Sequence, residues 1–192
     1  MRVKKTGTGL VRIIAGTLKG SKLPVLDKNG LRPTSNRVRE TVFNWLQHSI
    51  QDKQVLDLFA GSGALGFEAA SRLAKHVVLV ENDYEVAQVL RDNSVRLKTD
   101  SVEIIQADSL KWLSAYQGAP FDVAFLDPPF AFSQWTALWK CLAPVLNERA
   151  QVYIEHSVKE IIALPEQLSI LKQDKTSQSH FLLGQWHKSS VG

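Results

Sequence analysis

The feature that most constrains the fold is a regular alternation of apolar and amphipathic segments between residues 54 and 156. The apolar segments predict β-strands at 54–60, 76–81, 102–107, 121–126 and 151–156. The segments between them predict helices at 64–74, 84–97, 109–116 and 133–146. Because these strands are apolar nearly throughout, both of their faces should be covered, as in parallel sheets. The alternation therefore predicts an open, doubly wound α/β sheet with right-handed crossovers.

The two ends of the chain depart from this alternation. Residues 12–26 contain short β-like runs between glycines, which predict a small hairpin. Residues 32–46 predict a helix, with capping candidates Thr34, Ser35 and Asn36 after Pro33. Near the C-terminus, residues 168–174 and 179–188 flank a polar turn and predict two adjacent antiparallel strands.

The chain thus divides into a basic arm with a hairpin, residues 1–30, and a main domain, residues 31–192. The length of 192 residues and the 44% hydrophobic content suit one domain with a sizeable core. A single cysteine, Cys141, excludes an internal disulfide and a cysteine-built zinc site, and we predict no metal. The basic start lacks the apolar run of a signal peptide, and no stretch is long enough to span a membrane, so we expect a cytoplasmic protein.

Charge is distributed unevenly along the chain. Residues 1–40 carry ten lysines and arginines but only two acids, whereas the remaining residues have a net charge of −4. A basic arm on a slightly acidic body is typical of a protein that binds a polyanion, although a solvated basic terminus would look the same. The candidate nucleic-acid contacts in this segment are Arg12, Lys19, Lys22, Arg32, Arg37 and Arg39.

A glycine-rich loop, DLFAGSGALG at 57–66, joins the first predicted strand of the alternation to its helix. Its glycines, Gly61, Gly63 and Gly66, permit a tight turn and let backbone N–H groups approach a ligand. Glu81 ends the next strand, where a carboxylate can accept hydrogen bonds from both hydroxyls of a ribose. Together these features predict a site for a nucleoside-containing cofactor.

Acidic residues at three strand ends indicate which cofactor. Asp57 precedes the glycines, where its charge would repel a pyrophosphate and attract a cationic amino group. S-adenosylmethionine carries an ammonium group, a sulfonium, a ribose and an adenine, but no phosphate. Glu81 would bind its ribose, and Asp108 its adenine amine, unless Asp108 only caps the following helix. We also place the neighbouring Phe59 and Asn82 in this cofactor site.

The sequence Asp127-Pro128-Pro129-Phe130 follows the predicted strand at 121–126. The prolines restrict the backbone and lack N–H donors, which leaves a stiff rim of acceptors made of the Asp127 carboxylate and nearby carbonyls. Such acceptors can hold the hydrogens of an exocyclic base amine and stabilise the positive charge that develops on its nitrogen. Phe130 would stack on the base, which must leave its own stack to enter. A rigid turn ending the strand is the alternative interpretation.

These motifs resemble the class I S-adenosylmethionine-dependent methyltransferases that act on exocyclic amines. The segments VRIIAGTLKGSKLPV, LRPTSNRVRETVFNWL and LDPPF narrow the resemblance to the bacterial small-subunit ribosomal RNA guanine-N2 methyltransferases. The resemblance extends from about Val11 to the C-terminal hairpin. It implies a seven-stranded Rossmann-like sheet with an antiparallel last strand, and methylation of one guanine amine, within an assembled particle with ribosomal proteins, by a monomer.

The resemblance also implies roles for individual residues. It assigns amine binding to Asp127, Pro128, Pro129 and Phe130, and it implies that Arg32, Arg37 and Arg39 face RNA or shape the active site. The cofactor role falls on Asp57, Gly61, Gly63, Glu81 and Asp108. Glu155 and His156, which end the strand at 151–156, are weaker candidates for the border of the site.

Other functions remain open at this point. A DNA adenine-N6 methyltransferase uses the same acceptor rim, but this chain has little room for a separate target-recognition domain. A non-catalytic RNA-binding assembly factor would not need both intact motifs. A nicotinamide-dependent oxidoreductase is disfavoured by Asp57 and by the Asp-Pro-Pro-Phe segment.

Overall fold

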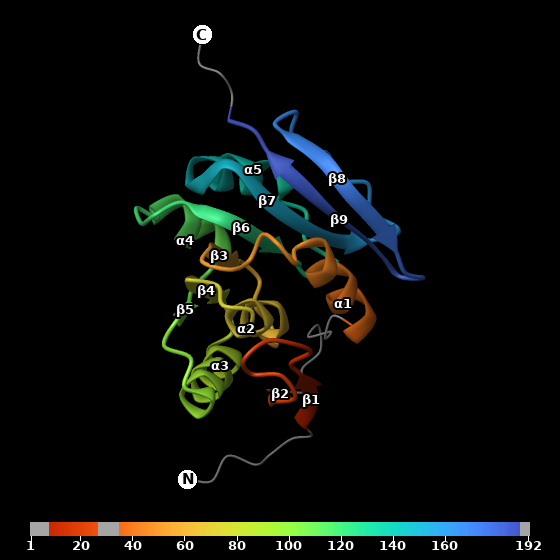
Figure 1. Cartoon of the computed structure of the whole chain (residues 1–192). Helices are drawn as coiled ribbons and strands as arrows, with labels where there is room; N and C mark the ends of the chain where they lie inside the picture. Colours follow the sequence, from red (N-terminus) through yellow and green to blue (C-terminus); the bar gives the residue numbers. More distant parts are fainter. Residues whose placement is uncertain (1–7, 27–34, 189–192) are drawn as a thin grey trace.

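The computed structural model describes residues 8–26 and 35–188 and contains one large mixed sheet (Figure 1). The seven strands of this sheet lie in the spatial order β5-β4-β3-β6-β7-β9-β8. Their bounds are β3 Gln54–Asp57, β4 His76–Glu81, β5 Val102–Gln106, β6 Phe121–Leu126, β7 Leu146–Ser157, β8 Leu168–Lys175 and β9 Ser179–Trp186.

The direction of the strands divides the sheet into two parts. Strands β3 to β7 are parallel, because each pair along the order β5-β4-β3-β6-β7 runs in the same direction. Strand β9 is antiparallel to both β7 and β8. The chain therefore reverses strand order beside β3, which is the place where open α/β sheets bind ligands. The predicted doubly wound sheet with an antiparallel C-terminal strand is confirmed.

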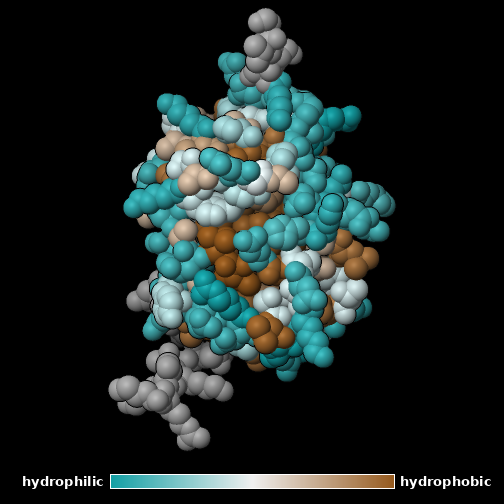
Figure 2. All heavy atoms as spheres, turned by 90° about the vertical axis from the view of Figure 1, so that its left-hand side faces the viewer, coloured by the Kyte–Doolittle hydropathy of each residue, from teal (hydrophilic) through white to brown (hydrophobic). Residues whose placement is uncertain are grey.

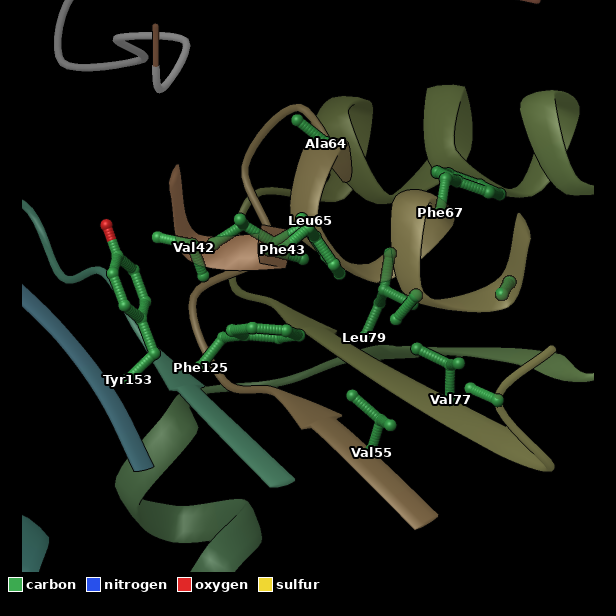
Figure 3. Packing of buried hydrophobic residues seen from close by; sticks show 14 of the residues in the cluster. Val42, Phe43, Val55, Ala64, Leu65, Phe67, Val77, Leu79, Phe125 and Tyr153 are labelled. Carbon is green, nitrogen blue, oxygen red and sulfur yellow. The ribbon is translucent and has the colours of Figure 1, made fainter. Parts of the chain in front are cut away.

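Helices cover both faces of the sheet. One apolar core lies between the sheet and the helices α1 Asn36–Trp45, α2 Ala64–Ser71 and α3 Tyr84–Leu97. A second core lies on the other face, against α4 Ser109–Ala115 and α5 Trp135–Leu142. Figure 3 shows part of the first core, where Phe43 of α1 and Leu65 of α2 lie over Leu79 and Phe125 of the sheet.

The predicted helix at 133–146 differs from the observed structure. Helix α5 ends at Leu142 and continues as a short 3-10 turn, Ala143–Val145, and Leu146 already belongs to β7. Pro144 explains the change, because proline has no N–H with which to continue the helical hydrogen bonds. The predicted strand at 151–156 is thus the second half of a 12-residue strand.

The N-terminal hairpin consists of β1 Thr8–Arg12 and β2 Lys22–Leu26 and is connected to helix α2 through buried side chains. The Glu68 carboxylate accepts hydrogen bonds from the backbone N–H groups of Ile14 and Ala15, at 2.7 and 3.0 Å. Leu23 and Val25 of the hairpin belong to the same apolar core as the sheet. The hairpin is therefore packed as part of one body with the sheet.

Strand β5 forms one edge of the sheet and carries half-buried Ile104 and Ile105 between exposed Glu103 and Gln106. Figure 2 views the molecule from the side that is on the left in Figure 1, and shows a central apolar area and smaller apolar areas among hydrophilic residues. Within residues 8–26 and 35–188, the structure has no helix of the length and apolarity needed to cross a membrane.

Candidate active site

A cavity of about 1060 Å³ opens where strands β3, β4, β6 and β7 end at their carboxyl termini. Its walls come from the start of α1, the glycine loop, the end of β4, the Asp-Pro-Pro-Phe segment, the end of β7 and the turn between β8 and β9. This volume is at the upper end of the range for small-molecule sites. It leaves room for a nucleoside cofactor and part of a second ligand.

Strand register brings four carboxylates to one face of the sheet at this cavity. Asp57 lies beside Leu79 of β4 and beside Phe125 of β6. Because strand side chains alternate between faces, Glu81, two residues after Leu79 in β4, points to the same side as Asp57. Asp127 is the first residue after β6, and its charge acts on Tyr153 of that face. The same reasoning places Glu155 there, because Phe125 is paired with Tyr153. All four carboxylates line the cavity.

The glycine loop is held in a conformation that only glycine adopts easily. Gly63 has a φ of 73°, and a Cβ atom there would lie 2.6 Å from Leu90 and 2.8 Å from the Phe67 ring. The N–H of Gly61 donates to a Glu81 oxygen at 2.9 Å, so the loop is tied to the end of β4. The predicted proximity of the glycines to Glu81 is therefore present in the structure.

Asp57 lies beneath this loop and is almost inaccessible to solvent. One of its oxygens accepts a hydrogen bond from the Gly66 N–H at 3.0 Å. Burial raises the pKa of Asp57 to about 7, against the lowering effect of the Gly66 hydrogen bond, and the Glu81 charge raises it further. A cation placed in the cavity beside this carboxylate would offset the cost of burying its charge.

The other predicted cofactor residues differ in where the structure places them. Phe59 and exposed Asn82 line the cavity, and both Glu81 oxygens accept backbone hydrogen bonds, from Gly61 and from Asp83. Asp108 does not line the cavity, because its carboxylate caps α4 by accepting from the Lys111 N–H at 2.9 Å. The structure brings Asp57, Phe59, Gly61, Glu81 and Asn82 together at one cavity, and a contact of Asp108 with adenine stays a prediction.

The Asp-Pro-Pro-Phe segment lines the cavity after strand β6, the neighbour of the strand that leads into the glycine loop. Pro128 is buried, Pro129 is exposed, and Phe130 keeps 44% of its side chain exposed beside the cavity. Two residues further along the chain, Phe132 packs against Phe59 and Trp135, with ring centroids 5.3 and 5.4 Å away. An exposed phenyl ring beside the cavity suits stacking against a planar ligand.

The predicted nucleic-acid contacts fall into three groups. Arg12, Lys19 and Lys22 are exposed on the hairpin, and exposed Arg37 on α1 also lines the cavity. Arg32 lies outside the described residues. The prediction that Arg39 contacts RNA is wrong, because the Arg39 side chain is fully buried and donates to Asn36 and to the Arg12 carbonyl.

Sequence reasoning missed part of the cavity wall. The turn between β8 and β9 contributes residues 176–179, and Tyr153 donates a hydrogen bond from its hydroxyl to Glu155 at 2.8 Å. Glu155 was only a weak candidate, and Tyr153 carries no local motif. The signal that could have found them was strand pairing, because the predicted C-terminal hairpin has to lie beside the strand that contains Tyr153 and Glu155.

Comparison with known proteins shows the family to which this chain is related. The family model described as "Conserved hypothetical protein 95" matches residues 11–185. A Haemophilus influenzae protein named ribosomal RNA small subunit methyltransferase D is 46% identical over 173 residues, covering 88% of this chain and 90% of the relative. The Escherichia coli protein of the same name is 40% identical over 183 residues, covering 94% and 92%.

Solved structures agree with the sequence relatives. The structure of yhhF from Escherichia coli has a TM-score of 0.85 and 39% identity, covering 94% of this chain and all of its own (100%). HI0767 from Haemophilus influenzae has a TM-score of 0.80 and 41% identity, covering 93% and 99%. The family expected from the sequence is thus confirmed: this chain belongs to the family of the ribosomal RNA small subunit methyltransferases D.

Proposed function

We propose that this protein transfers a methyl group from S-adenosylmethionine to the exocyclic N2 amine of a guanine in small-subunit ribosomal RNA. The observation that carries the proposal is one cavity in which the glycine loop with Asp57 and Glu81 faces the Asp-Pro-Pro-Phe segment. The names of the relatives support ribosomal RNA of the small subunit as the substrate class.

The cofactor side of the cavity fits S-adenosylmethionine. In this proposal the buried Asp57 carboxylate, whose pKa is raised to about 7, accepts from the ammonium group. Each Glu81 oxygen already accepts one backbone N–H and accepts from a ribose hydroxyl through a remaining lone pair. When bound, the cofactor would supply the methyl group from its positively charged sulfur, which keeps the electron pair of the broken S–C bond. The cofactor would then leave as S-adenosylhomocysteine. Phe59 lines the same space and supplies an apolar surface for the adenine.

The acceptor side is suited to an aromatic amine. The lone pair of such an amine is delocalised into its ring, so acceptors that hold its two hydrogens turn that lone pair toward the methyl group. Asp127 and the backbone carbonyls beside Pro128 and Pro129 are these acceptors, and Phe130 stacks on the base. After transfer, the new N–C bond leaves a cationic nitrogen, which loses one proton to Asp127 or to water. Most of the rate then comes from positioning.

The RNA lies, in this proposal, across the hairpin and the mouth of the cavity. Exposed Arg12, Lys19 and Lys22 on the hairpin and Arg37 at the cavity provide positive charge for the phosphates. We further propose that the monomer acts on an assembled or partly assembled particle that contains ribosomal proteins, in the cytoplasm where ribosomes are made.

The experiment that tests the proposal is transfer of a radiolabelled methyl group to three acceptors. These are small ribosomal subunits from cells that lack the enzyme, the naked RNA from those subunits, and unmethylated duplex DNA. Label recovered as N2-methylguanosine from either RNA sample supports the proposal and shows whether the particle is required. Label only in DNA adenine would establish the DNA methyltransferase instead, and no label with any acceptor would refute both activities.

A further inference from the structure

We propose that Glu155 reads the Watson–Crick edge of the target base by accepting a hydrogen bond from guanine N1–H, and that this contact selects guanine over adenine. The assignment rests on the proposed methyl transfer. It adds a specificity-determining residue to the acceptor side of the cavity, next to the group that holds the reacting amine.

Sheet geometry places Glu155 beside Asp127. The paired residues Phe125 and Tyr153 stand on the same face, as Figure 3 shows, with ring centroids 6.1 Å apart. Asp127 and Glu155 each follow one of these residues by two positions: Asp127 is the first residue after β6, and Glu155 lies near the end of the adjacent parallel strand β7. Both line the cavity, and Glu155 is only 8% exposed. Two carboxylates thus converge on one small region.

The Glu155 carboxylate is oriented by a buried tyrosine. The Tyr153 hydroxyl donates to one Glu155 oxygen at 2.8 Å, and Phe125 and Phe181 pack against the Tyr153 ring. Burial raises the pKa of Tyr153 well above its usual value, and the charges of Glu155 and Asp127 raise it further, so the hydroxyl stays protonated and keeps donating. This hydrogen bond involves one of the two carboxylate oxygens, and the second oxygen is the acceptor that we assign to the base in the cavity.

Base chemistry shows which ligand satisfies this pair. The Watson–Crick edge of guanine presents N1–H and two N2–H donors side by side, whereas adenine presents an amine beside the lone pair of its ring nitrogen N1. With the amine between Asp127 and Glu155, guanine can donate to both carboxylates. Adenine would instead turn its N1 lone pair toward Glu155, and a buried carboxylate facing another acceptor is strongly disfavoured. The pair of carboxylates therefore matches guanine.

Tyr153 is a positioning residue in this scheme, because it acts on the base through Glu155. Its replacement by phenylalanine keeps the ring that packs against Phe125 and Phe181 but removes the donor. Tyr153→Phe should lower discrimination between bases while leaving the affinity for S-adenosylhomocysteine unchanged. A purely structural role would leave the discrimination unaltered.

The test uses RNA in which the methylated guanosine, located first with the wild-type enzyme, is replaced by 2,6-diaminopurine riboside. This analogue keeps the 2-amine but has no hydrogen on N1. Wild-type enzyme should methylate the guanosine RNA about 10- to 100-fold faster than the analogue, in line with the discrimination of good paired base contacts. In Glu155→Gln the ratio should fall toward one, because an amide can donate to an unprotonated N1. Glu166→Gln, at an exposed residue outside the cavity, is the matched control.

The outcomes separate this assignment from the proposed function. A wild-type enzyme that labels guanosine and analogue at equal rates would overturn the role of Glu155 without any variant being needed. A Glu155→Gln enzyme that is slower on both RNAs by the same factor would overturn it as well. A wild-type enzyme that labels no guanosine in any acceptor would refute the proposed function itself, and the role of Glu155 with it.

Discussion

The two sides of the cavity are built in different ways. On the cofactor side, the carboxylates of Asp57 and Glu81 accept hydrogen bonds from backbone N–H groups of residues at most 20 positions away, such as Gly66 and Asp83. On the acceptor side, Asp127 and Phe130 meet Glu155 and the turn at residues 176–179 only because distant strands pair. One side is formed by a local motif and the other by the whole sheet.

This difference matches the two ligands in the proposed reaction. The cofactor is small and is the same in every reaction. It can bind to a loop whose hydrogen-bond donors and acceptors are already arranged, which limits the entropy cost of ordering the loop on binding. A base that must first leave its stack in the RNA needs a cavity that is open to solvent on the acceptor side. Phe130 and the turn at residues 176–179 border the cavity on that side. Changes on the acceptor side should therefore affect transfer, and changes on the cofactor side should affect folding and cofactor affinity.

The largest effect is expected from Asp127→Ala. Removing the carboxylate takes away an acceptor that stabilises charge only during transfer, and single groups of this kind contribute about 10²- to 10³-fold to turnover. Methyl transfer should fall by that factor, whereas the dissociation constant for S-adenosylhomocysteine, measured by equilibrium dialysis, should stay nearly the same. Asp174→Ala, at an exposed position on β8, is the control. Normal turnover by Asp127→Ala would show that the acceptor side is wrongly assigned.

The next effect concerns the local motif of the cofactor side. Gly63→Ala introduces a Cβ within 2.6 Å of Leu90 and within 2.8 Å of Phe67, two buried side chains. We expect this overpacking to reduce the free energy of unfolding by about 1–3 kcal/mol beyond the backbone strain, measured by urea denaturation.

Gly20→Ala is the matched control for that measurement. Gly20 also has a positive φ, 85°, but a Cβ there would meet no atom within 4 Å. The difference between the two variants isolates the packing term, because both carry the cost of a left-handed alanine. Equal losses of stability in Gly63→Ala and Gly20→Ala would show that the glycine loop is not as tightly packed as the structure has it.

What the sequence could predict follows the same division. Apolar periodicity was enough for the order of strands and helices, and the glycine loop with Glu81 was recognisable because its parts lie within 20 residues of each other. Residues 176–179 gave no such signal, since they reach the cavity only through the pairing of β7 with β9, and Tyr153 gave none because it acts only through its hydrogen bond to Glu155. Long-range register is decided by packing over the whole sheet, which no local pattern contains.

Arg39 shows the reverse error. Its position in a basic segment suggested a solvated side chain, yet it is fully buried within 4.0 Å of the Glu68 carboxylate. Glu68 in turn binds the Ile14 and Ala15 N–H groups of the hairpin connection. Counting charges treats each arginine alike, whereas the buried Glu68, which lies on a different helix, determines that Arg39 is buried in the core.

A smaller effect should appear in the pH dependence of cofactor affinity. The pKa of Asp57 is raised to about 7 in the free protein, so below pH 7 its carboxyl must lose a proton before it can pair with an ammonium group. The affinity for S-adenosylhomocysteine should therefore rise by roughly threefold to tenfold from pH 6 to pH 8 and level off above that. Asp57→Asn should bind more weakly and without this pH dependence. A wild-type affinity that is constant over this range would mean that Asp57 does not face the cofactor.

The smallest effect is expected far from both sides of the cavity, on the hairpin. Lys19 and Lys22 are exposed there, and each phosphate contact should contribute about one to the slope of log affinity against log salt concentration. Lys19→Gln with Lys22→Gln should lower that slope by up to about two for RNA binding, while turnover at saturating RNA stays unchanged. Lys172→Gln with Lys175→Gln, exposed on β8, should leave the slope unaltered. If instead the β8 pair lowers the slope and the hairpin pair does not, the RNA approaches from the edge strand, and the acceptor side of the cavity receives its base from the turn at residues 176–179.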